Sequence, residues 1–449
     1  MIRECLDIED DSWIRDLSER LEGGRREVDA DWKRTWPVDI FQGWWLQSFG
    51  YALAALYLFY FAILYRVGRW IIDGAGRPIY TDFACAWVAA LQAIHGHATS
   101  LYDPAKFVEM QAAVVAPSDY IYPNWPYPPT FLVILAPFAA LDYLHAFIAW
   151  DLLTLLGCVA VVYLIVRRRA AIAMALASPF TAWNFLAAQN GFLTASLLGA
   201  SLLLLKRQPV VAGVFIGCLT YKPQFGILFP VGLLAAGQWR AIVSCVITVV
   251  VLAGVAIAAF GGGVWIALPQ ELVAQAGLNL LADPNSNWAY LQSAYGLIRS
   301  LHSPPNLAWL AQGLVTFGSA VTVWIVWRSR VCYELKAAIL AAAALLATPY
   351  AFAYDTTAIV IPAAFLATDQ LSRGLLRGEK AIWIVLLGVP LAVLVTLGDN
   401  AGGKTFGGTP VSLFVASMLF FVILRRTLRC FGKPTIVDSG LGLQPATFR

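Results

Sequence analysis

Four charged side chains stand in or beside long apolar segments of the sequence: Asp82, Asp151, Lys222 and Asp355. A charge at the centre of a bilayer costs roughly 2.5–3.5 kcal/mol on insertion scales, so such residues usually have a role. All four fall on one side of the topology predicted below. A transporter would place them near the midplane, along a path from face to face. Their gathering at one headgroup plane favours a reaction on a lipid headgroup.

The composition indicates an integral membrane protein that crosses the bilayer many times. Hydrophobic residues make up 59% of the 449 positions and charged residues 13%, and the mean hydropathy is +0.69. Soluble domains are about 45–50% apolar and about 25% charged. The apolar residues form blocks of about 15–25 residues, the length that crosses about 30 Å of hydrocarbon. The net charge of +4 is small for this length and gives no indication of nucleic-acid binding.

The apolar blocks predict an all-α bundle of about twelve transmembrane helices. The expected spans lie near residues 44–65, 143–166, 171–188, 191–205, 209–221, 224–238, 241–260, 308–327, 335–349, 356–369, 380–397 and 409–424. Arg and Lys clusters follow every second span, as Arg167–Arg169 and Arg425–Arg426 do, whereas Arg66 and Arg69 break the pattern. The positive-inside rule then places both termini in the cytoplasm.

This topology divides the chain into a membrane domain, residues 44–426, between two charged cytoplasmic tails, residues 1–43 and 427–449. The first tail has no apolar core of signal-peptide length, so the first apolar block is expected to remain as an uncleaved helix. Two long loops, residues 67–142 and 261–307, then lie outside. Loops of that length are usually functional when they are ordered.

The first outer loop contains two segments with helical character. Residues 81–96, "TDFACAWVAALQAIHG", have helical apolar spacing and a Thr-Asp start, which predicts an amphipathic helix on the outer surface. Residues 128–141 are apolar, short and rich in proline, which predicts an interfacial or re-entrant helix. Between them, residues 118–129 hold the Tyr, Trp and Pro typical of a rigid segment at headgroup level.

The metal-ligating residue types are scattered. The seven cysteines form no CxxC pair, and His95 and His97 stand two apart with no nearby Cys or carboxylate to complete a ligand set. The sequence therefore assigns no metal site and no certain cofactor. A divalent cation is left open but is not indicated.

Seven short motifs follow one another along the chain. They read "TDF" (81–83), "GHATSLYDP" (96–104), "YPPTF" (127–131), "AQNG" (188–191), "YKPQFG" (221–226), "LQSAYGLIRSL" (291–301) and "ATPYAFAYD" (347–355). This order resembles glycosyltransferase family 87, polytopic enzymes of the GT-C fold that use a polyprenyl-phosphate sugar. The resemblance covers about residues 80–370 and rests on the ordered set of motifs.

The resemblance implies that Asp82 is the catalytic base of the first outer loop. A sugar on a polyprenyl phosphate already carries a good leaving group, so only the acceptor hydroxyl must lose a proton as it attacks. One carboxylate then suffices for an inverting displacement, unlike the paired carboxylates of glycosidases. The alternative is that Asp82 only caps the helix expected over residues 83–95, as Asp often does.

The charged candidates for substrate binding are Lys222, Arg299 and Asp355. Lys222 suits the donor phosphate as a point charge at headgroup depth, but lysines at span ends also snorkel to the interface. Arg299 competes for the phosphate role. Asp355 either binds acceptor hydroxyls or, as we favour, pairs with Lys222 or Arg299. For Asp151 we favour a hydrogen bond between helices over support of the site.

The polar candidates are Gln189, Asn190, Tyr127, Gln292 and Ser293. Gln189 and Asn190 suit hydrogen bonds to sugar hydroxyls, although amides at helix ends are often caps. Tyr127 is expected to shape its loop more than to touch substrate. Gln292 and Ser293 match the polar pair that the resemblance implies in the second outer loop.

Together these observations predict a GT-C-type glycosyltransferase on the outer face of a bacterial inner membrane. The resemblance implies a polyprenyl-phosphate donor carrying a hexose, by resemblance mannose, and a glycolipid or glycan acceptor. Two alternatives remain. An O-antigen ligase or polymerase would carry its catalytic loop late in the chain with clustered arginines. A lipid or solute transporter would have a midplane site and no dependence on Asp82.

Overall fold

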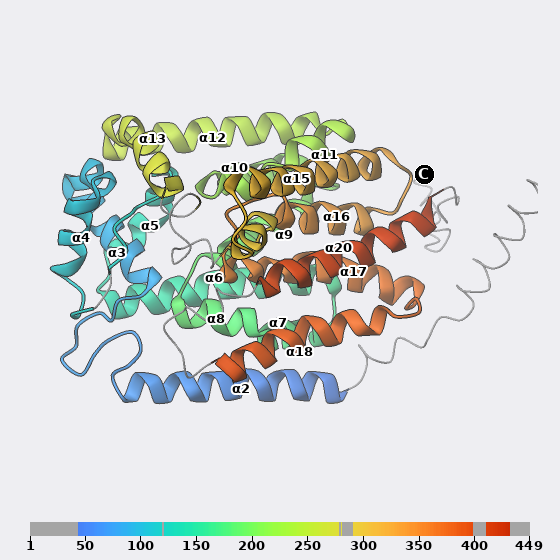
Figure 1. Ribbon diagram of the computed structural model, residues 1–449, viewed down its shortest axis with the longest axis horizontal. Coiled ribbons are helices and arrows are strands. Elements are labelled where there is room, and N and C mark those ends of the chain that lie inside the picture. The colour runs from blue at the N-terminus through green and yellow to red at the C-terminus, as the bar shows by residue number, and fades with distance from the viewer. Residues whose placement is uncertain (1–43, 119–120, 278–279, 281–290, 398–409, 432–449) are drawn as a thin grey trace, which may run out of the picture.

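The computed structural model describes residues 44–118, 121–277, 280, 291–397 and 410–431, and every structural statement below concerns these residues. In them the chain forms 18 α-helices joined by short 3₁₀ and π segments, and no β-strand (Figure 1). The predicted all-α membrane architecture is confirmed. The tail 1–43 and most of the tail 427–449 lie outside the described residues.

Five of the described helices are long and apolar enough to cross a membrane. They are α2 (Trp44–Arg66, of which Leu46–Arg66 qualifies), α6 (Tyr143–Val166), α12 (Trp239–Phe260), α15 (Pro305–Arg328) and α20 (Val411–Cys430). The other predicted spans contain α18 (Glu379–Leu397, 19 residues) and shorter helices: α9 (Gly191–Leu204), α10 (Pro209–Cys218), α11 (Phe229–Ala235), α16 (Tyr333–Leu346) and α17 (Val360–Arg373). By length and composition alone, the described residues therefore hold five spans, or six with the bent pair described next.

The segment predicted as one span at 171–188 is broken into α7 (Arg169–Ala177) and α8 (Pro179–Ala187), which meet at 61°. Pro179 is the cause. Proline has no N–H to continue a helix, and it drives the residue before it out of the helical region. Ser178 accordingly has ψ 127°. A proline also starts the 3₁₀ segment η5 (Pro223–Phe225), which leaves α11 shorter than the span predicted at 224–238.

The long helices lie side by side along the long axis of the molecule, and the two ends of this bundle differ (Figure 1). One end, here called the loop end, carries α3 (Asp82–Gln92), α4 (Pro104–Ala112), α5 (Pro129–Ala139) and α13 (Gly263–Ala276). The opposite end, here called the tail end, holds the first and last described residues. Helix α14 (Ala294–Ser300) precedes α15.

Aromatic packing fixes the loop end. The ring of Phe83 on α3 lies 6.1 Å from that of Trp150 on α6, and the ring of Phe131 on α5 lies 4.9 Å from that of Tyr221. Helix α5 has 11 residues, about 16 Å at 1.5 Å per residue, too short to cross the hydrocarbon. It packs against α3 and α12 instead. This core holds the start of α3 next to the segment that carries Lys222.

Candidate active site at the loop end

Asp82 is the first residue of α3, and its side chain is exposed. The N-cap of this helix is Thr81, whose hydroxyl accepts a hydrogen bond of 3.2 Å from the backbone N–H of Ala84 and shares another of 3.1 Å with the Tyr143 hydroxyl. The alternative that Asp82 only caps the helix is therefore wrong. Thr81 performs that role and leaves the Asp82 carboxylate available.

Two predicted site residues act directly on Asp82. The side chain of Gln189 donates a hydrogen bond to its carboxylate, and the positive charge of Lys222 attracts it. Although the side chain is exposed, the surrounding protein desolvates the carboxylate and raises its pKa, and this effect outweighs the lowering by Gln189 and Lys222. A raised pKa makes the carboxylate a better proton acceptor at neutral pH, as a general base requires.

Lys222 lies in a break between two 3₁₀ turns, η4 (Leu219–Tyr221) and η5, where Pro223 prevents a continuous helix. Its side chain is 4% exposed, and its Nζ donates to Oδ1 of Asp355 at 2.6 Å. The ring of Tyr354 lies 4.6 Å from the same Nζ, within cation–π range. A snorkelling lysine would expose its ammonium group to water, so the burial of Lys222 excludes that alternative.

Asp355 lies on the 3₁₀ segment η8 (Ala353–Ile359) and is 1% exposed. Its Oδ2 accepts a hydrogen bond of 3.0 Å from the backbone N–H of Phe352, and its Oδ1 binds Lys222. The structure thus pairs Asp355 with Lys222 rather than with Arg299. Because both carboxylate oxygens have donors, Asp355 can hold Lys222 in place while buried.

The turn between α8 and α9 connects Asp82 to the ion pair of Lys222 and Asp355. Gln189 holds Asp82, and the Asn190 amide donates to the Tyr127 hydroxyl at 3.0 Å. The Tyr127 hydroxyl also shares a hydrogen bond with Tyr354. This turn packs tightly, because a Cβ at Gly191 would lie 2.4 Å from the Tyr354 carbonyl oxygen on η8. The structure therefore brings Asp82, Lys222, Asp355, Gln189, Asn190 and Tyr127 into one connected network.

Contacts with backbone groups order the three predicted residues of the second outer loop. The N–H of Gln292 donates to the Ala351 carbonyl at 2.6 Å, which places Gln292 near the segment before Asp355. Ser293 is the N-cap of α14, and Arg299 Nη1 donates to the Ser303 carbonyl at 2.9 Å. These contacts order the loop. They do not join Arg299 to the network around Lys222.

Asp151 does not form the expected helix–helix bond. It lies on α6 and is 1% exposed, and neither carboxylate oxygen has a hydrogen-bond partner among the residues that the structure describes.

Two features of the loop end were not predicted. The ring of Tyr354 lies against the Lys222 ammonium group. Its position next to Asp355 in "AYD" could have indicated that it belongs to the site. Glu271 on α13 accepts a hydrogen bond of 2.6 Å from the Asn124 amide and so joins the second outer loop to the first. The sequence shows that Glu271 is an acidic residue in a long outer loop. It does not show that its partner is Asn124, because the two residues are 147 positions apart.

An all-α membrane protein with one exposed carboxylate beside a buried lysine and several polar side chains has the parts of a membrane group-transfer enzyme. The family model of glycosyltransferase family 87 matches residues 125–349, half of the chain. The chain belongs to this family and is a membrane glycosyltransferase. No curated protein and no solved structure matches it.

Proposed function

We propose that the chain transfers a hexose, mannose by resemblance, from a polyprenyl-phosphate donor to a hydroxyl of a glycolipid or glycan acceptor. Asp82 is the general base. The observation that supports this most directly is the environment of the Asp82 carboxylate. It is exposed, it does not cap α3 because Thr81 does, and the positive charge of Lys222 attracts it. It is the part of the loop-end network open to an incoming hydroxyl.

The proposed reaction is a single displacement at the anomeric carbon. The acceptor oxygen forms the new bond to that carbon as the bond to the phosphate oxygen breaks with its electron pair. The acceptor proton passes to Asp82, and polyprenyl phosphate leaves. Attack from the face opposite the leaving group inverts the anomeric configuration. General-base assistance of this kind typically contributes about 10²–10⁴-fold.

Lys222 is proposed to bind the donor phosphate. An ammonium group has three N–H donors, and the salt bridge with Asp355 at 2.6 Å uses one of them. The remaining donors suit phosphate oxygens in a site shielded from water, where electrostatic stabilisation of a leaving group is strongest. Gln189, Asn190 and Tyr127 are proposed to bind sugar hydroxyls. Gln292, Ser293 and Arg299 are proposed to border the acceptor side.

The proposed location is the outer face of a bacterial inner membrane. Arg167, Arg168 and Arg169 lie where α6 ends, at the opposite end of that helix from the proposed site. The positive-inside rule supports a cytoplasmic tail end and an outward loop end. Family membership favours glycosyl transfer over the transporter and O-antigen ligase alternatives.

The test supplies the purified protein, in lipid nanodiscs, with defined polyprenyl-phosphate hexoses and a mixed glycolipid acceptor. We expect release of polyprenyl phosphate that depends on acceptor, with the mannose donor the most active. Nucleotide sugars serve as the control donor. Transfer from a nucleotide sugar, with none from any polyprenyl-phosphate sugar, would refute the proposed donor while leaving the family intact.

A further inference from the structure

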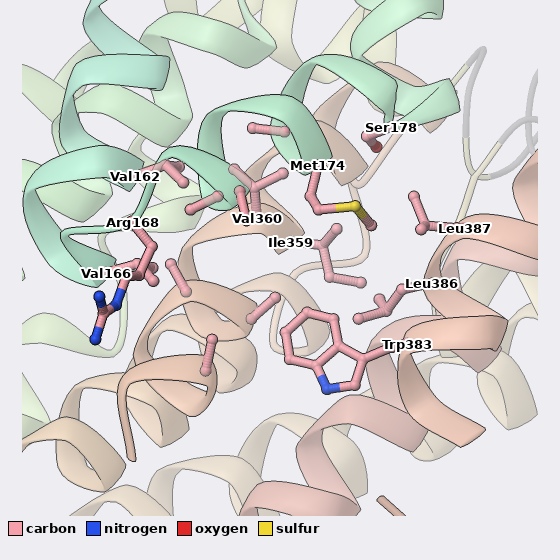
Figure 2. Close-up of a pocket in the computed structure, with 16 residues that line it drawn as sticks. Val162, Val166, Arg168, Met174, Ser178, Ile359, Val360, Trp383, Leu386 and Leu387 are labelled. Atoms are coloured by element: carbon pink, nitrogen blue, oxygen red, sulfur yellow. The ribbon is translucent and has the colours of Figure 1, made fainter. Parts of the chain in front are cut away.

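An apolar pocket lies between α6, α7, α17 and α18, and none of the proposed active-site residues lines it. Its cavity volume is about 80 Å³, and one side of it is open to the exterior. The walls come from the end of α6, from α7 and the following Ser178, from Ile359 at the end of η8, from α17 and from α18. Sixteen described residues line it, twelve of them aliphatic, and Met174 and Trp383 project into it from different sides (Figure 2).

Small side chains leave this space open. Ala170, Ala171 and Ala175 of α7 and Ala363, Ala364 and Ala367 of α17 all border the pocket. Facing alanines usually allow two membrane helices to approach closely. Here α7 packs on α2 and α6, while α17 packs on α16 and α6, so the alanine faces border a pocket. The aliphatic lining and the open side suit part of a hydrocarbon chain that enters from the bilayer.

Among the described residues, one charged side chain lines the pocket. Arg168 stands between α6 and α7, is exposed, and is flanked by the exposed Arg167 and Arg169. Arg168 is also the N-cap position of α7, and no side chain caps that helix start. Uncapped N–H groups and a guanidinium group both favour a phosphate. One end of the apolar pocket therefore carries the features of an anion site.

We propose that this pocket binds an anionic phospholipid, with one acyl chain along the alanine faces and the phosphate at Arg168. Basic sites between membrane helices at the cytoplasmic surface are a recurring way to recognise anionic headgroups. The inference does not depend on the proposed reaction, since it involves none of the loop-end residues.

The position of the charge favours a phospholipid over the tail of a polyprenyl donor. Helix α6 has 24 residues, about 36 Å at 1.5 Å per residue, between its start beside Thr81 and its end before Arg167. A donor with its phosphate at Lys222 would enter from the loop end and bring no charge to Arg168. A phospholipid of the tail-end leaflet brings its phosphate to the correct end.

The methionines offer a direct test. The chain has four, and Met174 is the one that lines the pocket, whereas Met418 lies partly exposed on α20. The protein is made with photo-methionine and placed in nanodiscs of phosphatidylglycerol and phosphatidylcholine. After illumination, the lipid adducts of each methionine peptide are identified by mass spectrometry. A matched experiment adds polyprenyl phosphate, and another adds soluble glycerol phosphate as a competitor.

We expect Met174 to crosslink phosphatidylglycerol about fivefold above its share of the bilayer, the enrichment that one arginine near the surface provides. Met418 should report the bulk ratio. Arg168→Gln should return Met174 to the bulk ratio, and Arg330→Gln, which removes an exposed charge outside the pocket, should not. Ala171→Leu, which fills the pocket, should reduce all adducts at Met174. Glycerol phosphate should not compete.

Several results would overturn the proposal. A bulk lipid ratio at Met174 in the wild type would mean that Arg168 selects nothing. Preferred adducts with polyprenyl phosphate would assign the pocket to a donor tail. Adducts with peptides of residues 1–43, or with a second copy of the chain, would make it a protein contact.

Discussion

Buried charge occurs at both ends of the bundle, in two different arrangements. At the loop end, Lys222 pairs with Asp355 close to the exposed carboxylate of Asp82. Near the tail end, Arg426 on α20 binds Asp369 on α17 and donates to Glu379 of α18 at 2.6 Å. This second group, here called the arginine cluster, is 0–3% exposed at all three residues.

The comparison separates a cluster that holds helices together from one that can react. In the arginine cluster, Arg426 also donates to the Gly374 carbonyl at 2.8 Å, and Gln370 donates to Glu379 at 3.0 Å. These contacts join three helices and offer no open side. At the loop end the buried pair adjoins a carboxylate that solvent can reach. Catalysis is favoured at the loop end because the exposed carboxylate of Asp82 lies beside the buried pair of Lys222 and Asp355.

The largest effect should come from Asp82→Asn. The amide keeps the size of the side chain but removes the basic oxygen, so transfer should slow by at least about 100-fold, while expression in the membrane stays normal. The measurement is single-turnover release of polyprenyl phosphate. The matched control is Thr81→Ala, which should cost about 1 kcal/mol of local stability with transfer near normal. If Asp82→Asn retains more than about a third of the rate, Asp82 is not the base.

The arginine cluster should respond in stability alone. Arg426→Met leaves Asp369 and Glu379 buried without their cation, which typically costs about 3–5 kcal/mol. We expect a strongly lowered unfolding temperature in detergent, with normal kcat in the fraction that remains folded. Arg425→Met is the control, because Arg425 is exposed and, within the described part of the chain, donates to the Arg377 carbonyl. A catalytic defect without loss of stability would reverse the roles of the two regions.

Lys222→Met should impair both properties, and a double variant should separate them. The single change leaves Asp355 buried without its partner, so stability should fall as it does for Arg426→Met. Adding Asp355→Asn removes the uncompensated charge and should recover most of that loss. Donor affinity should stay about 10–100-fold weaker in both variants, because a charged hydrogen bond to phosphate is missing. Normal donor binding in the double variant would mean that Lys222 only holds Asp355.

The smallest effect is a shift in the pH profile. Desolvation by the surrounding protein raises the pKa of the Asp82 carboxylate, so the acid limb of kcat/KM should lie above the value of about 3.9 for an ordinary aspartate. Below that pKa the protonated carboxyl cannot accept a proton. The raised pKa favours the protonated folded state, so this contribution to stability is complete below about pH 3.9 and is lost as pH rises through the folded pKa. Protonation of Asp82 at low pH should therefore inactivate the enzyme but should not by itself unfold it. If Asp82→Asn has the same acid limb as the wild type, the limb does not report Asp82.

Hydropathy predicts where the long helices lie, but it predicts poorly where a helix is broken. The span predicted at 143–166 coincides with α6, because a long apolar run between charged ends leaves little choice of boundary. The break before Pro179 was missed, since prolines are tolerated in membrane helices and only neighbouring packing decides whether one bends the chain. The sequence left open whether Asp82 caps α3, because Thr81 and Asp82 both suit that position, and the structure gives the cap to Thr81.

The site was predicted as a set of residues and not as a set of contacts. The sequence motifs named Lys222 and Asp355. Whether Asp355 pairs with Lys222 or with Arg299 remained open until the structure placed its Oδ1 2.6 Å from the Lys222 Nζ. Arg426 shows the limit more clearly. Its sequence neighbourhood is a cluster of basic residues typical of a cytoplasmic boundary, yet its side chain is fully buried. Partners 57 and 47 positions away decide this, and periodicity does not reveal them.

The distance in sequence between Lys222 and Asp355 also matters for how the protein is made. They are 133 positions apart, so at about 5–20 residues per second the ribosome needs about 7–27 s to supply the carboxylate after the lysine. During that interval the ammonium group has no Asp355 to pair with, and its turn is best solvated at the membrane surface. The lysine can enter its buried position only after η8 has been synthesised. A nascent chain released before residue 355 would lack the carboxylate that pairs with Lys222 in the folded protein.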